Sequence, residues 1–402
     1  MKYLYLSLLF ILSIFFISAD KKQDLSKESL IRDIDDYANK IIRNHAHPFN
    51  YIKKEQFLDS IKAFKEKAPG MNVDELQVGY TRINALLLDP HTALDFPREK
   101  SIPIIVSLFD DGTFVTATSI KHVRHLGSRV IAMNDIPIDT VLKKMQCLIG
   151  ALNPSWVKHN LPGLLFNVSM LYGMHLIDNK DSVAITFVSE TDTTRQMVST
   201  ENEYSFELQS YKPAAHMLRM GNSQNYWYQY LEDKKSLYIQ YRSCHEITDK
   251  PFAKFQENVM AEIHKQKPER IIIDVRANSG GLVNVFNPLI KALARDSISR
   301  LAKSSVLISR KTFSAAIWNT FELKNQLQAT LIGEETGGDL NHPGAVVNFT
   351  LKHSKLKVYY SKYDFYLDAR VKGGILPDIT VPHTFANYKK GVDPDLEKAL
   401  TY

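Results

Sequence analysis

Cysteine is scarce in this 402-residue chain, which has only Cys147 and Cys244. Two cysteines so far apart exclude a disulfide scaffold, a zinc knuckle and a redox pair. They could form one disulfide or stay as two buried thiols, and the sequence leaves both open. The chain also lacks a His-Glu-x-x-His helix, an aspartate-rich calcium loop and a glycine-rich phosphate loop followed by Lys-Ser or Lys-Thr. No metal and no other cofactor is therefore expected.

Long apolar runs are absent after residue 19, and neither sign of charge is concentrated. Lys and Arg number 50 against 44 Asp and Glu, and the lysines are scattered along the chain. This distribution argues against nucleic acid as the main partner. The apolar content of 44% and the length are enough for a sizeable core, divided over two or three domains.

The first 19 residues have the pattern of a signal peptide. One lysine precedes an apolar run from Tyr3 to Ile17, and Ile-Ser-Ala precedes Asp20. An uncleaved anchor is the alternative, but the run is slightly shorter than the roughly 20 apolar residues that a bilayer needs. We therefore expect a cleaved signal peptide, residues 1–19, and a periplasmic or secreted protein. Peripheral membrane association is expected only if the segment stays uncleaved.

Helical periodicity follows the signal segment. Apolar stripes cover 25–42 and 57–64, and a third helix, with Asp74 as its N-cap, runs toward the break at Asp89-Pro90. These patterns predict an N-terminal helical domain over residues 20–98.

The next segment changes to β structure. Strands at 102–108 and 113–118 flank an Asp-Asp-Gly turn, which predicts a hairpin. Residues 127–135 and the helix that starts at Asp139 resemble the second half of a PDZ-type domain, placed at 99–150. PDZ domains bind extended peptides by strand addition. The alternative is an ordinary sheet domain that only packs against its neighbours.

Residues 151–402 are interpreted as the core. Their first part has a helix near 161–171, a strand at 183–188 and a polar stretch at 190–202, which we interpret as connection and sheet cover. Strands and helices then alternate at 237–241, 252–264, 271–275, 283–294, 305–308, 314–327 and 330–333. Alternation predicts βαβ units with a mostly parallel sheet, and a site at the strand ends. The fold class is therefore α/β within an α+β multidomain chain.

Three strand ends carry unusual loops. Asp-Val-Arg-Ala-Asn-Ser-Gly-Gly at 274–281 lets the backbone approach a ligand and point N–H groups at it. Phe-Ser-Ala-Ala at 313–316 places a hydroxyl at a helix start, and Gly-Glu-Glu-Thr-Gly-Gly follows at 333–338. Taken singly, the serine would be an N-cap and the glycines a turn.

In this order and spacing, the motifs resemble the core of the S41 family of peptidases, the tail-specific and tricorn-type proteases. Gly-Ile-Leu-Pro-Asp at 374–378 resembles that family's Gly-x-x-Pro-Asp signature. The resemblance is strong over 235–402 and looser before it. It implies a crotonase/ClpP-like α/β protease core behind the helical and PDZ-like domains, with a protein or peptide substrate. It also implies Ser314 as the nucleophile and an oxyanion hole from the N–H groups of Gly280, Gly281 and Ala315.

A serine nucleophile needs a base. The tail-specific branch uses a lysine just after the Thr-x-Gly loop, where this chain has Gly-Asp-Leu-Asn at 338–341, so that dyad is absent. The tricorn-like branch takes a histidine from a motif resembling Leu-x-Asp-x-His, and this chain reads Leu-Asp-Pro-His at 88–91. The resemblance thus implies His91 as the general base.

The third catalytic group departs from the family pattern. Tricorn-type sites use a glutamate shortly before the Gly-x-x-Pro-Asp signature, where this chain has Val371. Asp368 is nearby but displaced, and it is the candidate orienting acid. A nucleophile, a base and oxyanion donors retain some rate without that group.

The leading hypothesis is an exported serine endopeptidase that acts through an acyl-enzyme. The alternative is a catalytically weakened binding protein for peptides or apolar ligands, because the same fold carries apolar ligands in retinoid-binding relatives. A crotonase-type acyl-CoA enzyme is disfavoured by export and by the nucleophile-like Ser314.

Overall fold

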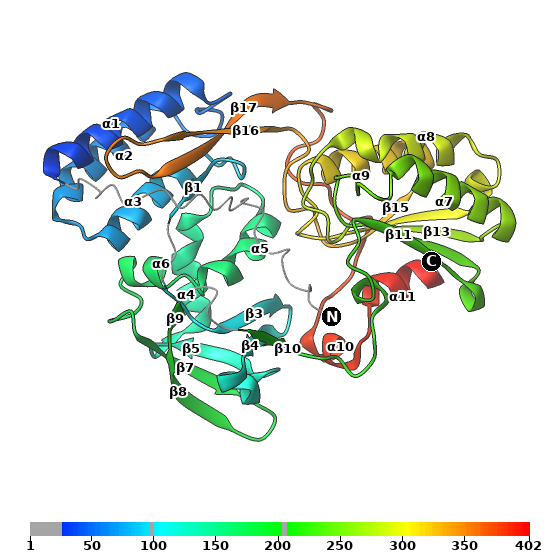
Figure 1. The fold of residues 1–402 in the computed structure, drawn as a ribbon, viewed down its shortest axis with the longest axis horizontal. Coiled ribbons are helices and arrows are strands. Elements are labelled where there is room, and N and C mark those ends of the chain that lie inside the picture. The colour runs from blue at the N-terminus through cyan, green and yellow to red at the C-terminus, as the bar shows by residue number, and fades with distance from the viewer. Residues whose placement is uncertain (1–25, 97–99, 203–206) are drawn as a thin grey trace.

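The computed structural model describes residues 26–96, 100–202 and 207–402, which form three units (Figure 1). A helical unit and a β unit lie on one side, and an α/β unit lies on the other. The predicted signal segment at 1–19 lies outside the described residues. Within the described ranges, no helix has the length and apolar character needed to cross a membrane.

Three amphipathic helices make up the helical unit: α1 (Lys27–Asn44), α2 (Lys54–Lys67) and α3 (Val73–Ala85). Their apolar stripes meet in one core, in which Tyr37 and Phe57 are completely buried. The three predicted helices are therefore confirmed, and burial of one face is what stabilises each of them.

The start of α3 differs from the prediction. Asn72 is the N-cap, because its side chain accepts the Glu75 N–H at 3.0 Å and the Glu75 carboxylate accepts the Asn72 N–H at 2.8 Å. This capping box satisfies two N–H groups at the helix end. Asp74 instead lies in the first turn, where its carboxylate binds Lys180.

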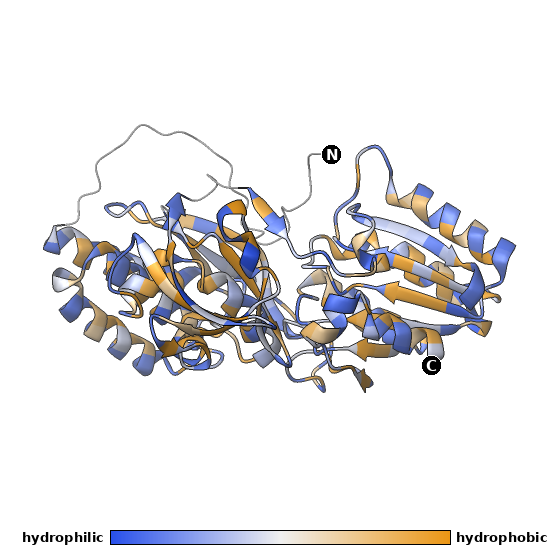
Figure 2. Ribbon diagram, turned by 90° about the horizontal axis from the view of Figure 1, so that it is seen from below, coloured by the Kyte–Doolittle hydropathy of each residue, from blue (hydrophilic) through white to orange (hydrophobic). Residues whose placement is uncertain are grey.

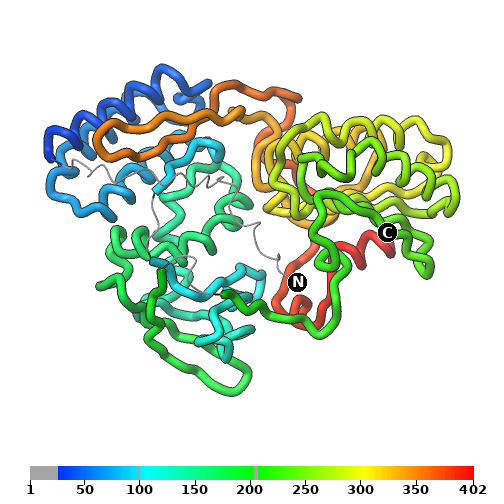
Figure 3. Tube along the Cα trace, in the orientation of Figure 1, coloured from blue at the N-terminus to red at the C-terminus, as the bar shows by residue number. Residues whose placement is uncertain are grey.

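A hairpin arm, defined as residues 342–365, leaves the α/β unit and covers the helical unit (Figure 3). It consists of β16 (His342–Thr350) and β17 (Lys357–Phe365), and β17 pairs with β1 (Ala93–Asp95). Leu351 and Val358 of the arm are fully buried in the core of the three helices. Burial of such a side chain contributes about 1.5–3 kcal/mol, so apolar packing holds the arm in place.

The β unit is a sheet with the strand order β10-β4-β5-β7-β8, in which β3 also pairs with β4 and β6 with β5. Its strands are β3 (Ile104–Phe109), β4 (Gly112–Ser119), β5 (Arg129–Met133), β6 (Ile136–Pro137), β7 (Ser182–Val188), β8 (Thr193–Ser199) and β10 (Leu208–Ser210). The predicted Asp-Asp-Gly hairpin is confirmed by the antiparallel pairing of β3 with β4. A separate pair joins β2 (Lys100–Ser101) to β9 (Glu201–Asn202).

The sheet continues beyond residue 150. The polar stretch at 190–202, interpreted from the sequence as a connection, contains β8, which buries only Val198 and therefore lacks an apolar signal. The helices of this unit are α4 (Ile138–Met145), α5 (Pro154–Leu164) and α6 (Val168–Gly173). The single helix predicted near 161–171 is thus two helices, because Asn167 caps the start of α6.

The α/β unit has the strand order β11-β12-β13-β14-β15-β18, with β11 antiparallel and the remaining neighbours parallel. The strands are β11 (Tyr226–Leu231), β12 (Ser236–Tyr241), β13 (Arg270–Asp274), β14 (Lys303–Ile308), β15 (Thr330–Gly333) and β18 (Ile379–Thr380). The helices are α7 (Phe252–Gln266), α8 (Asn287–Arg295), α9 (Ala315–Leu327), α10 (Phe385–Lys390) and α11 (Pro394–Thr401). The predicted mostly parallel sheet is confirmed.

Both faces of this sheet are covered, which explains its continuous apolar strands (Figure 2). In β13, Ile271 and Ile273 join the apolar cluster under α7, α8 and α9, whereas Ile272 joins the cluster that includes α11. Parallel strands buried on both faces read as uninterrupted apolar runs.

Neither cysteine forms a disulfide in the described chain. Cys147 is exposed and Cys244 is buried. Of the two possibilities left open by the sequence, the disulfide is excluded, and only one of the two thiols is buried.

A buried ionic network connects β13 to the C-terminal helix. Arg276, just after β13, donates to Asp274 at 2.6 Å, to Asp393 at 2.6 Å and to Asp395 at 2.9 Å. Asp395 in turn lies 2.9 Å from Nε2 of His383. Breaking a buried ion pair by removing one partner is strongly destabilising, so these contacts fix the C-terminal segment to the sheet.

The β unit contacts the same segment. The Asp110 N–H donates to the His383 carbonyl at 2.9 Å, and the Asp110 carboxylate accepts the His383 N–H at 2.7 Å. The next residue, Asp111, accepts the Phe385 N–H at 2.8 Å. The predicted turn therefore joins the β unit to the α/β unit as well as connecting two strands.

Protonation of His383 should make stability depend on pH. Burial alone would lower the pKa of His383, but the carboxylates of Asp395 and Glu334 raise it to about 9 from 6.5. Because the folded-state pKa is the higher one, the contribution is complete below about pH 6.5 and is lost as the pH rises to about 9.

We expect the free energy of unfolding of the wild type to fall between pH 6.5 and 9, and the slope to be smaller in His383→Gln. Urea denaturation at several pH values measures both slopes. His175→Gln is a matched control, because that histidine is on the surface. Equal slopes in His383→Gln and the wild type would contradict the prediction.

Candidate active site

Ser314 lies between β14 and α9 in a strained backbone conformation. Its φ of 53° and ψ of −126° are rarely adopted by residues other than glycine. Such a conformation costs about 1–3 kcal/mol and persists only where the surroundings enforce it. Within the described residues, the Ser314 hydroxyl accepts no hydrogen bond from the N–H groups at the start of α9. The N-cap explanation therefore does not account for this half-buried serine.

The loop after β13 holds the serine turn in place. The Phe313 N–H donates to the Asn278 carbonyl at 3.0 Å. Asn278 is completely buried, and its side-chain amide donates to the Tyr241 carbonyl at 3.1 Å. Cys244 lies beside it, with Sγ 3.4 Å from the Asn278 Oδ1. The asparagine thus ties the ends of β12 and β13 to the turn that carries Ser314.

Gly280 makes the close approach that this arrangement requires. Its φ is 102°, and a Cβ at this position would lie 2.8 Å from Cβ of Ser314 and 3.0 Å from the Phe313 carbonyl oxygen. Both the backbone conformation and the space exclude a side chain. Of the two glycines predicted to approach a ligand, Gly280 therefore packs directly against Ser314, whereas Gly281 packs against Cys244 and His245.

The three predicted oxyanion donors differ in their availability. The Gly280 N–H already donates to Asn278 Oδ1 at 2.9 Å. Within the described residues, the N–H groups of Gly281 and Ala315 donate to no protein acceptor. Ala315 is the first residue of α9, where the helix end carries partial positive charge. The pair that remains for an oxyanion is therefore Gly281 and Ala315.

His91 is next to the nucleophile turn. Its ring lies between Phe313, at a centroid distance of 4.6 Å, and His342 of the arm, at 4.8 Å. Phe313 immediately precedes Ser314, so the structure brings His91 against the residue next to the predicted nucleophile, from a part of the chain more than 200 residues away. In the part of the chain that the structure describes, neither ring nitrogen of His91 has a hydrogen-bond partner.

A carboxylate lies beside this histidine. Asp89 Oδ1 accepts the His91 backbone N–H at 3.0 Å and lies 3.6 Å from the His91 Nδ1. Its Oδ2 accepts from Ser361 of the arm at 2.6 Å and lies 3.0 Å from Nε2 of His45. Burial alone would raise the pKa of Asp89, but the hydrogen bonds from His45 and Ser361 and the neighbouring ring of His91 hold it well below its usual range. Asp89 is therefore ionised.

Asp368, the acid proposed from the sequence, has other partners. Its carboxylate binds Arg370 at 2.6 Å and 2.9 Å, which lowers its pKa to about 2. Its backbone N–H and carbonyl both bind the side chain of Asn341. Asn341 lines the same small cavity as His91, so Asp368 is near the site while its charge is paired with Arg370.

The cavity beside His91 has a volume of about 10 Å³. That is roughly the space for one water molecule. It is also lined by Asp339, whose pKa is raised to about 6 by burial and by the neighbouring Glu335. The cavity is too small for a peptide, and Ser314 is not among the residues that line it.

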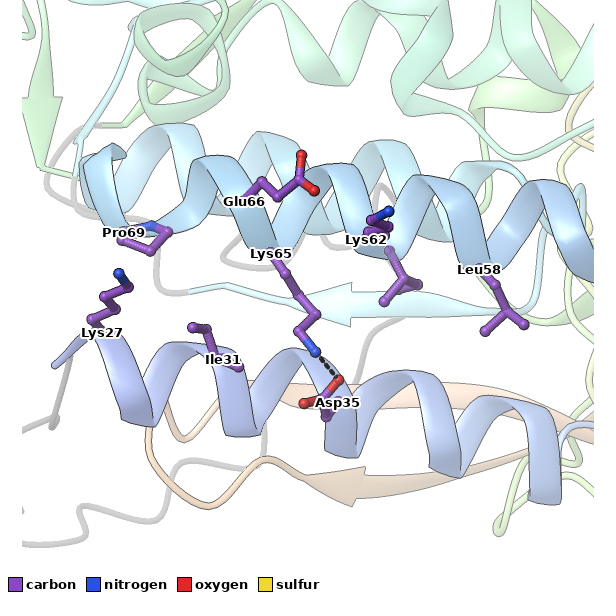
Figure 4. A pocket seen from close by; sticks show the side chains of 9 residues that line it. Lys27, Ile31, Asp35, Leu58, Lys62, Lys65, Glu66 and Pro69 are labelled. Atoms are coloured by element: carbon purple, nitrogen blue, oxygen red, sulfur yellow. Dashed lines mark hydrogen bonds and ion pairs between the residues drawn. The ribbon is translucent and has the colours of Figure 1, made fainter.

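A larger groove lies elsewhere. It has a volume of about 510 Å³ and runs between α1 and α2 (Figure 4). Lysines line much of it, and Lys65 is paired with Asp35 at 2.6 Å. The candidate site residues lie at the small cavity beside His91 and in the turn that carries Ser314. The volume of a cavity therefore does not by itself identify the site. No group of three or more potential metal ligands occurs among the described residues.

No family model matches the sequence, and no curated protein matches it. Solved structures do. Mature CPAF superposes with a TM-score of 0.69 at 13% identity, over 94% of this chain and 97% of that one. A candidate peptidase from Parabacteroides merdae superposes with a TM-score of 0.51 at 15% identity, over 93% of this chain and 96% of that one.

The chain has an S41-type peptidase fold. The fold inferred from the four sequence motifs is thereby confirmed.

Within this S41-type fold, no sequence pattern pointed to a role for Asp89 or to the aromatic packing around His91. The Leu-Asp-Pro-His motif contained Asp89, but its spacing to His91 gave no role for the carboxylate. Trp156 of α5 stacks on the other face of Phe313 at 4.1 Å, and no motif pointed to it. These residues come from three units, so only the tertiary structure brings them together.

Gly280→Ala should destabilise the folded protein by about 1–3 kcal/mol, because alanine at φ 102° is strained and its Cβ would collide with Ser314. Chemical denaturation measures the change. Gly163→Ala in α5 is the control, since a Cβ there meets nothing within 4 Å. It should be neutral or stabilising by up to about 1 kcal/mol. Equal stability of Gly280→Ala and the wild type would contradict the assigned packing.

Proposed function

We propose that this protein is a serine peptidase that hydrolyses peptide bonds through an acyl-enzyme, with Ser314 as nucleophile and His91 as general base. The observation that carries the proposal is the state of Ser314. Its backbone is strained, its hydroxyl does not cap α9, and among the described residues the nearby N–H groups of Gly281 and Ala315 have no protein acceptor. A strained conformation of this kind is retained where it serves function. The packing of His91 on Phe313 supplies a base at the adjoining position.

The reaction follows from these positions. The Ser314 oxygen attacks the substrate carbonyl carbon while its proton passes to His91. The oxygen of the tetrahedral intermediate takes the negative charge and accepts hydrogen bonds from Gly281 and Ala315. Loss of one such donor typically costs about 10²–10³ in rate. His91 then returns the proton to the leaving amine, and water hydrolyses the acyl-enzyme by the same steps in reverse.

Relatives in structure support a peptidase as the class of activity. CPAF has also been solved in complex with lactacystin, with the same TM-score of 0.69 and 13% identity. Its fold covers 94% of this chain. The likeness supports a peptidase with a protein or peptide substrate, and the chemistry itself is proposed from the residues of this chain.

The remaining expectations from the sequence belong to the same proposal. We propose export through a signal peptide at 1–19 to the periplasm or the medium, and a PDZ-like role for the β unit in binding extended peptides. The Asp110–His383 contacts join its sheet to the α/β unit. This connection supports a role close to the proposed active site. No cofactor enters the proposed reaction.

Labelling with a fluorophosphonate tests the nucleophile and base without knowledge of the substrate. We expect the wild type to be labelled, Ser314→Ala to be inert, and His91→Ala to react about 10²–10⁴-fold more slowly, because the hydroxyl then lacks its base. The second-order rate constant is the quantity measured.

Ser189→Ala and His175→Ala, both on the exposed surface, are matched controls that should react like the wild type. Absence of labelling in folded wild-type protein would reject the hydrolase proposal. Unchanged labelling of Ser314→Ala would reject Ser314 as the nucleophile.

A further inference from the structure

The family resemblance implies a glutamate before the Gly-x-x-Pro-Asp signature, and this chain has none at that position. Val371 occupies that position, and its side chain packs on the apolar core of the α/β unit. Asp368 holds Arg370 with both carboxylate oxygens. Without a carboxylate, the His91 ring would have no partner that selects its tautomer or fixes its rotation.

Asp89 has the geometry of such a partner. The side chain is only 2% exposed, and its Oδ1 lies 3.6 Å from the His91 Nδ1. That is an ion-pair distance, and catalytic hydrogen bonds are often long in structures without substrate. The backbone N–H of His91 binds the same Oδ1 at 3.0 Å, which fixes this oxygen beside the ring.

The other oxygen of Asp89 is fully engaged. Oδ2 accepts from the hydroxyls of Thr92 and Ser361 and lies 3.0 Å from the buried ring of His45. The three partners come from different elements: His45 from the end of α1, Thr92 from the loop after α3, and Ser361 from the arm. Such support from three elements is typical of a group whose orientation matters. It leaves Oδ1 for His91.

We infer that Asp89 is the positioning residue that replaces the missing glutamate: it keeps the proton of His91 on Nδ1 and leaves Nε2 to take the proton of Ser314. The inference rests on the proposed Ser314–His91 reaction. The arm then has a part in the mechanism, because Ser361 is one of the groups that hold Asp89 in place.

Among the residues that the structure describes, Asp89, His342, Tyr51 and Asp339 are titratable groups around His91, and they differ in charge. Asp89 is ionised, as argued above. Burial and the neighbouring His91 lower the pKa of His342 to about 4, so His342 is neutral near pH 7. Burial and nearby carboxylates raise the pKa of Tyr51, which stays neutral as well. Asp339, across the cavity, has a pKa of about 6 and is the other negative group.

The test is the pH dependence of fluorophosphonate labelling in Asp89→Asn. The variant should react at least about 10²-fold more slowly, because an amide favours the wrong tautomer. The acid limb of its pH–rate profile should move to lower pH by about one unit, because protonation of the imidazole is less favourable without the adjacent negative charge. A purely structural role would reduce the active fraction and leave the limb unmoved.

Asp35→Asn is the matched control, since it removes one surface carboxylate from the same unit and should leave both rate and limb unchanged. Asp368→Asn and Asp339→Asn test the two rival carboxylates. A wild-type rate and limb in Asp89→Asn overturn the inference while wild-type labelling upholds the proposed function. A limb that moves in a rival variant and not in Asp89→Asn overturns it too.

A second measurement covers the case in which Asp89→Asn does not fold. Nitrogen-15 spectra of histidine-labelled wild-type protein report which ring nitrogen of His91 carries the proton, with His91→Gln used for assignment. A proton on Nδ1 of the neutral ring supports the inference, and a proton on Nε2 overturns it. If the folded wild type is not labelled at all, the proposed function fails and this inference fails with it.

Discussion

The ring of Phe313 joins the three units at the candidate site. Trp156 of the β unit stacks on one face at 4.1 Å, and His91 of the helical unit packs on the other at 4.6 Å. Aromatic pairs of this kind contribute about 0.5–1.5 kcal/mol beyond their buried area. Because Ser314 is the next residue in the chain, any shift between the units moves the proposed base relative to the proposed nucleophile.

The arm makes that arrangement stable. It starts at His342, which packs on the outer side of His91, and it continues into the apolar core of the helical unit. The arm therefore contributes both to the surroundings of His91 and to the core of the unit that carries it. The hydroxyl of Ser361, in the other strand of the arm, binds the carboxylate next to His91. Apolar packing supplies the stability, and a few hydrogen bonds supply the position.

Buried charge fixes the other half of the site. Arg276 is surrounded by three carboxylates, and these contacts raise its pKa well above the usual value although burial by itself would lower it. The same loop continues to Asn278 and Gly280, which pack against the serine turn. The ionic network thus links the C-terminal helix α11 to the backbone that would stabilise an oxyanion.

Local patterns determined much of this protein. The parallel strands, the Asp-Asp-Gly hairpin and the serine at a helix start follow from side-chain periodicity and turn chemistry, which act between residues close in the chain. The strand β8 was not predicted, because a largely exposed strand has no alternation of apolar and polar residues. Motifs with recognisable spacing also indicated Ser314 and His91 as candidate site residues, each from its own part of the sequence.

Only the tertiary structure decided how these pieces meet. Asp89 binds Ser361 across 272 positions, and the Gly280 N–H is taken by Asn278, which leaves Gly281 and Ala315 as donors. The first contact has no local signal, because it depends on how the units pack, whereas the second is a local contact between residues two apart in the loop after β13. Sequence by itself specified the elements and the reactive residue types, whereas packing between units decided which carboxylate lies beside His91, because Asp89 is held by residues far from it in the chain.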